Sequence, residues 1–243
     1  MLPEIRYTIL ILSLLGITQP CYAQQISADT AFLAVSHKKS IALYAASIQH
    51  QSRLYNGSDY NIYLPKNEEH PYFRMDDWVY GSIVYWDELY ENVPLLYDVS
   101  VDQLITEHNR GNAIKLIAEK IQSFTILEHT FVRLSSDDKN KISEGFYDRL
   151  YDGDLKVYAK YSKNFRETIE TTEVIPHYDE ATRYYLVKEG IFNVVKTKGS
   201  VLQIFRDHKQ DVKNFLRKNR IRFKDNREKA IVRITEFYDT LNN

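Results

Sequence analysis

The sequence predicts a mainly β protein of the α+β class, arranged as an antiparallel β-meander, a sandwich or a half-barrel. Between residues 51 and 205, runs rich in Tyr, Val, Ile and Phe are separated by turn residues, as in hairpin-connected strands. After Phe205 the apolar period changes to that of amphipathic helices. We therefore expect an antiparallel β domain over residues 51–205 and a helical hairpin packed on it over residues 206–243.

Residues 1–23 have the pattern of a secretory signal peptide. Arg6 precedes an apolar run from Tyr7 to Ile17, and Ala23 provides the small residue of a cleavage site. The run is shorter than the roughly 20 residues that span a membrane. Cleavage after Ala23 would remove Cys21, the only cysteine, and with it any thiol chemistry. We expect an exported protein, periplasmic or associated with the outer envelope, with no transmembrane segment in the mature chain.

A short N-terminal helical segment is predicted within residues 24–50, because Ile41, Tyr44, Ala45 and Ile48 share one helix face. Strands are then predicted in pairs around turns. They are Trp78 to Trp86 and Leu89 to Asp98, Val101 to Glu107 and Ala113 to Ile117, Phe124 to Leu127 and Thr130 to Leu134, Phe146 to Tyr151 and Leu155 to Tyr161, and Arg183 to Lys188, Ile191 to Lys196 and Val201 to Phe205.

Two details of this pattern need a choice. Residues 113–124 also fit a helix, but the surrounding hairpins favour strand. Asp152-Gly153 predicts a two-residue turn in which Gly153 adopts positive φ. In the helical region, Asp207 with Gln210 and Asp225 with Glu228 predict capping boxes at the start of two helices.

Aromatic residues are concentrated in the first predicted hairpin. Cross-strand aromatic pairs are an ordinary way to stabilise a sheet. The alternative is a concave face that stacks on a glycan, lipid or peptide. Its candidate residues are Trp78, Tyr80, Tyr85, Trp86, Tyr90 and Tyr97.

Charge is unevenly distributed although the net charge is only -1. Acidic residues dominate between Asn67 and Leu104, and basic residues dominate between Lys213 and Lys229. Such stretches are commonly solvated faces, but a basic patch can also bind the acidic sheet or an anionic partner. The candidate patch residues are Lys213, Arg217, Lys218, Arg220, Arg222, Lys224 and Arg227.

No catalytic motif occurs in the chain: G-x-S-x-G, the P-loop, G-x-G-x-x-G and H-E-x-x-H are all absent. The histidines have no metal-binding spacing. Adjacent carboxylates such as Asp76-Asp77 are not opposed across a cleft, as acid/base catalysis requires. We therefore nominate no catalytic residue, cofactor or metal, and favour a protein that is not an enzyme.

Five segments of turn and strand residues form a recognisable set: Leu54 to Tyr60, Gly81 to Tyr85, Tyr90 to Asp98, Gly145 to Tyr147 and Leu150 to Gly153. Together they resemble a group of exported Bacteroidota proteins with no assigned activity. The resemblance implies an envelope location and supplies no catalytic residue.

These observations favour a non-catalytic envelope protein that binds a partner or ligand through its sheet. The partner would be an envelope protein, a glycan or a lipid, and no nucleic acid is expected. Two alternatives remain: a periplasmic carrier of lipid or another amphiphile, which requires an apolar cavity, and a carboxylate-based periplasmic hydrolase, which requires opposed carboxylates.

Overall fold

The computed structural model describes residues 53–62, 69–108, 111–137, 142–170 and 173–242. The chain divides into two compact units, Met1–Gln49 and His50–Asn243, and every described residue belongs to the second. The predicted signal peptide and the predicted helix within residues 24–50 therefore lie outside the described residues.

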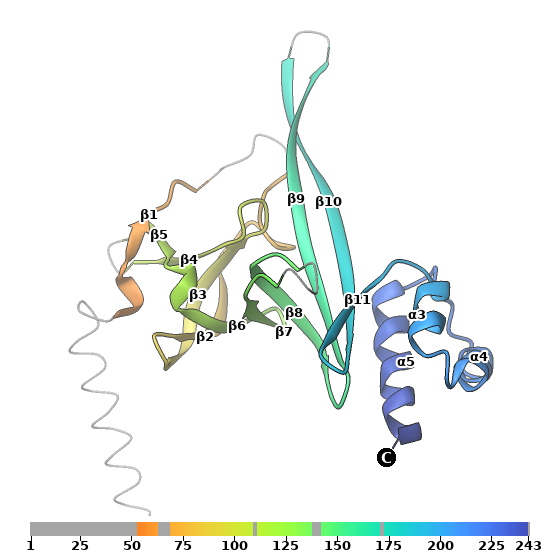
Figure 1. The fold of residues 1–243 in the computed structure, drawn as a ribbon. Coiled ribbons are helices and arrows are strands. Elements are labelled where there is room, and N and C mark those ends of the chain that lie inside the picture. Colours follow the sequence, from red (N-terminus) through yellow and green to blue (C-terminus); the bar gives the residue numbers. More distant parts are fainter. Residues whose placement is uncertain (1–52, 63–68, 109–110, 138–141, 171–172, 243) are drawn as a thin grey trace, which may run out of the picture. The chain divides into compact units, whose positions relative to one another are not determined.

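The described strands form one open antiparallel sheet, which confirms the predicted mainly β class (Figure 1). They are β1 (Gly57–Asp59), β2 (Val79–Tyr85), β3 (Glu88–Asp98), β4 (Gln103–Glu107), β5 (Ala113–Leu116), β6 (Ile121–Ile126), β7 (His129–Leu134), β8 (Gly145–Asp152), β9 (Lys156–Glu170), β10 (Glu173–Lys188) and β11 (Ile191–Val195). Across the sheet their order is β1-β5-β4-β3-β2-β6-β7-β8-β9-β10-β11. Most neighbours are therefore consecutive in the chain, while the sandwich and half-barrel alternatives stay predictions.

Two-residue turns connect several of these strands. Both turn residues have positive φ at Trp86-Asp87 (53° and 62°) and at Glu189-Gly190 (54° and 75°). This geometry matches the twist of the flanking strands. The second turn lies where the sequence predicts it, whereas the first comes one residue earlier than the predicted Asp87-Glu88.

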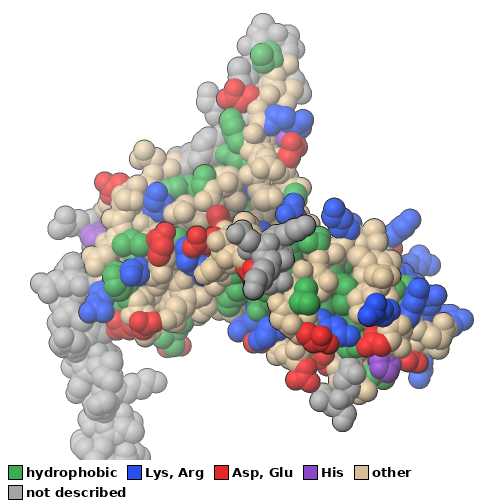
Figure 2. All heavy atoms as spheres, in the orientation of Figure 1, with side chains coloured by type: hydrophobic (Ala, Val, Ile, Leu, Met, Phe, Trp, Pro, Cys, Tyr) green, Lys and Arg blue, Asp and Glu red, His purple; other side chains and the backbone are tan. Residues whose placement is uncertain are grey.

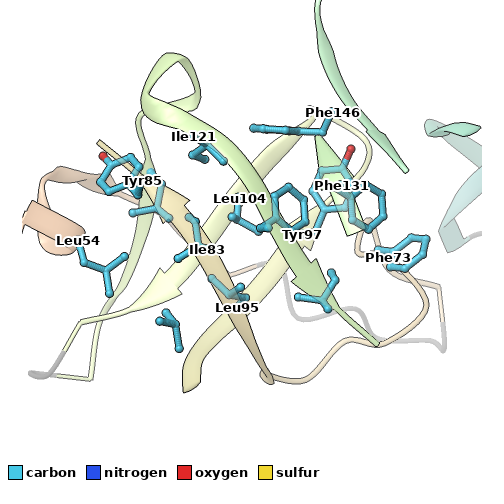
Figure 3. Close-up of a cluster of buried hydrophobic side chains, with 14 of the residues drawn as sticks. Leu54, Phe73, Ile83, Tyr85, Leu95, Tyr97, Leu104, Ile121, Phe131 and Phe146 are labelled. Carbon is cyan, nitrogen blue, oxygen red and sulfur yellow. The ribbon is translucent and has the colours of Figure 1, made fainter. Parts of the chain in front are cut away.

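The sheet from β2 to β8 buries a cluster of side chains rich in aromatic rings, which we call the aromatic core (Figure 3). Phe131 lies at its centre, with its ring centroid 4.8 Å from Phe124, 5.0 Å from Tyr97 and 5.1 Å from Phe73. Edge-to-face and offset-stacked rings at such distances add stability beyond the burial of their area. The strands themselves supply most of this cluster, and Phe73 joins it from the segment before β2.

The last strands differ from the prediction. β9 and β10 are 15 and 16 residues long, far longer than the predicted Leu155 to Tyr161 and Arg183 to Lys188. Val201 to Phe205, predicted as a strand, lies mostly in helix α3 (Lys198–Ile204), so the strands end at Val195. The reason is the preceding residue Thr197, which forms a capping box with Ser200 and starts a helix there.

The turn between β8 and β9 also corrects an expectation. Gly153 is not among the residues with positive φ, and its N–H donates to the carbonyl oxygen of Leu155 at 3.0 Å. Asp239, from the C-terminal helix, accepts hydrogen bonds from Tyr151 Oη (2.8 Å) and from the Leu155 N–H (3.3 Å). The turn is therefore fixed by a tertiary contact and not by glycine's conformational freedom.

Two further helices follow, α4 (Lys209–Lys218) and α5 (Arg227–Asn242). Neither predicted capping box forms at its aspartate. The N-cap of α4 is His208, and Asp207 instead accepts hydrogen bonds from Tyr238 Oη and from Lys188 Nζ. At α5, the side chain of Asn226 accepts the Lys229 N–H at 2.8 Å.

The helices share a second hydrophobic cluster with β9, β10 and β11, which we call the helical core. Its buried residues include Val201, Phe205, Val212, Leu216, Ile231 and Ile234 from the helical region and Val157, Ala159, Tyr184, Leu186 and Val195 from the strands. Tyr161 on β9 is partly buried and packs against both cores. No helix in the described part of the chain is long and apolar enough to cross a membrane.

Candidate functional site

The aromatic residues predicted as a ligand face do not share one face of the sheet. Tyr85 and Tyr97 are 0% and 1% exposed and belong to the aromatic core, and Tyr90 is partly buried against it. Trp78 packs against a different, smaller cluster. The six residues are separated because neighbouring positions of a strand point to opposite faces of the sheet.

The two remaining aromatic residues are exposed. Tyr80 is 67% exposed, and Trp86, at 36%, has the Lys120 ammonium 4.2 Å from its ring centroid. Scattered exposed aromatic rings are normal on a protein surface. These two residues alone do not build a binding face.

The predicted basic patch, by contrast, is exposed throughout. All seven of its side chains are exposed, and Figure 2 shows Lys and Arg side chains gathered over the region of α3, α4 and α5. Within the described residues none of the seven forms an ion pair. This positive charge therefore has no acidic ion-pair partner in the part of the chain that the structure describes.

In the link between α4 and α5, half-buried apolar residues alternate with exposed cations. Ile221 and Phe223 are half-buried and pack against the helical core. The Ile221 N–H donates to the carbonyl oxygen of Leu216 at 2.9 Å, which fixes the start of the link. Because the apolar residues face the core, Arg222 and Lys224 on either side of Phe223 face solvent.

A pocket of about 880 Å³ lies where this link meets β10 and the start of α3. It is lined by Thr182 and Tyr184 of β10, by Lys196, Thr197, Lys198 and Gly199 around the start of α3, and by Arg222, Phe223, Lys224, Asp225 and Arg227. Five of these side chains are cationic and only Asp225 is anionic. Three patch residues, Arg222, Lys224 and Arg227, thus line a common pocket, whereas Lys213, Arg217, Lys218 and Arg220 are not in its lining.

Sequence reasoning missed Lys196 and Lys198, which complete the pocket. They flank Thr197, whose N–H and side chain hydrogen-bond with Ser200 at 3.1 and 3.2 Å. The Lys196 N–H donates to the same Ser200 hydroxyl at 3.1 Å. The available signal was Thr197 followed three residues later by Ser200, a pattern that marks a helix start and fixes the backbone between two lysines.

Tyr184 lines the pocket from β10 and is only 9% exposed. Its hydroxyl donates to Glu228 Oε2 at 3.4 Å. Burial, followed by the negative charge of Glu228, raises the pKa of Tyr184 to about 12. The Tyr184 hydroxyl is therefore neutral at physiological pH and adds no negative charge to the pocket.

A buried polar chain lies beside the pocket. His129 Nδ1 is 2.5 Å from Asp148 Oδ2, and Tyr161 Oη lies 3.1 Å from Asp148 Oδ2 and 3.2 Å from Glu228 Oε2, so its one proton serves either carboxylate. Asp148 is 1% exposed, so it does not face Glu228 across an open cleft. The chain links β7, β8, β9 and α5, which is a structural arrangement and not the open pair of carboxylates that a hydrolase needs.

Asp76 and Asp77 do not form such a pair either. Both are exposed, and Asp77 Oδ1 accepts the Trp78 N–H at 2.7 Å. Over the described ranges, no group of three or more His, Cys, Asp and Glu residues could hold a metal ion.

Comparison of the chain with protein-family models, curated proteins and solved structures finds no match. The resemblance to exported Bacteroidota proteins therefore stays a prediction. The function is therefore inferred from the geometry of this chain's own residues.

Proposed function

We propose that this protein is an exported, non-catalytic binding protein that takes an anionic ligand or partner in the pocket between β10, α3 and the start of α5. One observation carries the proposal: five cations line one pocket with a single carboxylate among them. Preorganised cations bind oxyanions through charge-assisted hydrogen bonds. Arg222 and Arg227 can bind an oxyanion in bidentate fashion, and the lysines act as point charges.

Binding of inorganic phosphate tests this proposal. The variant Arg222→Ser/Lys224→Ser removes two charges from the pocket, and the control Lys213→Ser/Lys218→Ser removes two charges from the patch outside it. We expect the pocket variant to bind phosphate at least about tenfold more weakly, a loss of about 1.4 kcal/mol. The control should change phosphate affinity by less than about twofold, because exposed charges at a distance are screened by salt.

Isothermal titration at low ionic strength measures both affinities, and the thermal midpoint confirms that each variant is folded. Equal phosphate binding by the wild type and the pocket variant would contradict the proposal. Equal losses in the two variants would contradict it as well, since they would indicate a diffuse patch and no defined pocket.

A carrier of an anionic amphiphile is a second candidate for the same pocket. The rings of Tyr184 and Phe223 line it beside the cations, which suits a ligand with an acidic group and an apolar chain. Native mass spectrometry of the protein purified from the cell envelope in which it is made distinguishes the carrier from the anion-binding protein. A co-purifying lipid supports the carrier, whereas a phosphate-binding protein without lipid supports the first proposal.

Export is part of the proposal and has its own test. We propose cleavage after Ala23, because the charged start, apolar run and small residue of a signal peptide precede it. N-terminal sequencing of the envelope fraction should begin at Gln24. An intact N-terminal Met1 in a cytoplasmic fraction would contradict the envelope location.

A further inference from the structure

A second pocket of about 440 Å³ adjoins the proposed anion-binding pocket. The two pockets share Thr182, Lys196 and Arg227 in their walls, so a ligand can extend from one into the other. Among the described residues that line the second pocket, none is Asp or Glu, and Lys160 and Arg183 add further cations to its wall. The positive charge of the first pocket therefore continues beyond it.

The second pocket lies over the opposite face of the sheet. Residues directly opposite each other in an antiparallel pair point to the same face, and successive residues of a strand alternate between faces. Arg183 of β10 is paired with Lys160 of β9 and shares a face with it, whereas Thr182 and Tyr184 of the first pocket point to the other face. A ligand that fills both pockets must therefore pass around the edge of β10.

The edge of β10 is open at this crossing. β11 pairs with β10 only as far as Tyr184, and beyond that point no described strand pairs with this edge (Figure 1). The Tyr178 N–H donates to Glu69 at 2.9 Å and so points away from β9. Because strand N–H groups alternate in direction, the N–H of Thr182, four residues further on, points to the same open side. The crossing thus offers a backbone donor beside the cations that both pockets share.

The second pocket adds one cation that no carboxylate neutralises. Within the described residues, Arg183 forms no ion pair, and neither do the shared Lys196 and Arg227. Lys160 differs from them, because its Nζ lies 2.6 Å from Asp102 Oδ2. Arg183 is therefore the residue through which the second pocket can bind a further anionic group.

The two pockets together are much larger than one phosphate group requires. Pockets of about 300–1,000 Å³ ordinarily hold drug-sized ligands, and the first pocket alone has about 880 Å³. A single oxyanion would contact only some of the cations and would leave the others unneutralised. A chain of anionic groups would contact cations in both pockets and would form charge-assisted hydrogen bonds in each.

We propose that the ligand is a linear oligoanion, with at least two successive acidic groups, that crosses the open edge of β10 and places one group in each pocket. This inference rests on the proposed anion-binding function and names the chemical class of its ligand. Arg222 and Lys224 bind the group in the first pocket, and Arg183 binds the group in the second. Lys196 and Arg227 bind the chain at the crossing. Oligophosphates and acidic oligosaccharides share this chemistry.

The gain in affinity with ligand length tests the proposal. Isothermal titration at one ionic strength compares inorganic phosphate with tripolyphosphate, and galacturonate with trigalacturonate. Because linked groups bind the second pocket at high effective concentration, we expect one three-unit ligand per chain to bind at least about tenfold more tightly than its single unit. The probe that shows this gain identifies the source of the anion.

Arg183→Ser separates the second pocket from general charge effects. It removes a cation that lines the second pocket and not the first, so we expect the affinity ratio of three-unit to single-unit ligand to fall at least about fivefold. The control Lys213→Ser removes one exposed cation outside both pockets and should change this ratio by less than about twofold. The thermal midpoint of each variant confirms that it is folded.

Three outcomes would overturn the inference, and they differ in what they leave standing. Equal losses for Arg183→Ser and Lys213→Ser would indicate a diffuse basic surface without a second site. If phosphate binds and neither three-unit ligand gains affinity, the ligand is a single anion and the proposed function stands. If neither phosphate nor any three-unit ligand binds, the proposed function fails as well.

Discussion

The aromatic core and the helical core bury the apolar side chains of the sheet in different ways. From β2 to β8 the sheet buries its rings mainly against its own strands, and Tyr85, Tyr90 and Tyr97 of the aromatic-rich hairpin take part in this packing. From β9 to β11 the strands share their cluster with three helices, and the links between these helices leave cations exposed around a pocket. The comparison teaches that the aromatic residues mostly indicate the buried core, whereas the cations without an ion-pair partner among the described residues indicate the candidate site.

Phe131→Ala is expected to have the largest effect, because it removes the ring at the centre of the aromatic core. Truncating a buried Phe costs about 3–5 kcal/mol of unfolding free energy. Trp86→Ala, at an exposed aromatic position of the same region, should cost less than about 1 kcal/mol. Urea denaturation measures both. Similar losses for the two variants would mean that the buried and exposed rings of this region do not differ as described.

Ile234→Ala makes the corresponding change in the helical core, where Ile234 is 0% exposed. We expect a loss of about 2–5 kcal/mol. Because Tyr161 packs against both cores, the loss should appear as one cooperative transition of strands and helices. Unfolding followed by near-UV and far-UV circular dichroism checks this. Separate transitions, or an unchanged midpoint for the strands, would show that the helices are a detachable tail.

Gly153→Val should have an intermediate effect of about 1–3 kcal/mol. A Cβ atom at Gly153 would collide with Tyr151 Oη and with the Asp239 carboxylate, so one of their hydrogen bonds must break. Gly199→Ala is the control, since its added Cβ meets only Thr197 Oγ1 at an ordinary 3.4 Å. Thermal unfolding of the two variants compares them. A neutral Gly153→Val would mean that α5 does not hold this turn.

The smallest effect is expected for Asp207→Asn, and it depends on pH. Burial works against the charge of Asp207, but hydrogen bonds from Tyr238 and Lys188 outweigh it and lower its pKa to about 2. A carboxylate whose pKa is lower in the folded state stabilises above the unfolded pKa of about 4, and this stability is lost as pH falls towards 2. Because Asp207 is partly exposed, solvent screening reduces the contribution to about 1 kcal/mol.

Unfolding curves between pH 2 and pH 7 test this prediction. The wild type should lose more stability than Asp207→Asn between about pH 4 and pH 2, and the two should differ most near pH 7. Parallel curves over this range would show that the contact with Tyr238 and Lys188 does not stabilise the folded chain.

Much of the strand pattern could be predicted because apolar and turn residues alternate locally. The full length of β9 and β10 could not, since Lys163, Arg166 and Glu167 break the apolar alternation that signals a half-buried strand. The pairing of β2 with β6 joins strands that are not consecutive, and no local pattern specifies such a partner. Similarly, Asp207 was expected to cap α4, but Tyr238 and Lys188, distant in sequence, take up its carboxylate.

The candidate site was predictable only in part. Arg222, Lys224 and Arg227 stand out as basic residues in a short stretch, so composition alone identified them. Lys196, Lys198 and Tyr184 join them only because β10, β11 and α3 bring distant segments together. The pocket is thus a product of tertiary structure, while three of its five cations are already visible in one short stretch of the sequence.

The contact of Asp239 with the β8–β9 turn has a consequence for the kinetics of folding. The Leu155 N–H and its acceptor are 84 residues apart, and Tyr151 and the same carboxylate are 88 apart. Closing loops of this length costs chain entropy before any contact rewards it, so such contacts form late. We expect Asp239→Asn to leave the refolding rate nearly unchanged and to accelerate unfolding. Stopped-flow measurements of both rates test this expectation. The contact of α5 with the turn would then form after the sheet and would set the unfolding rate of the native state.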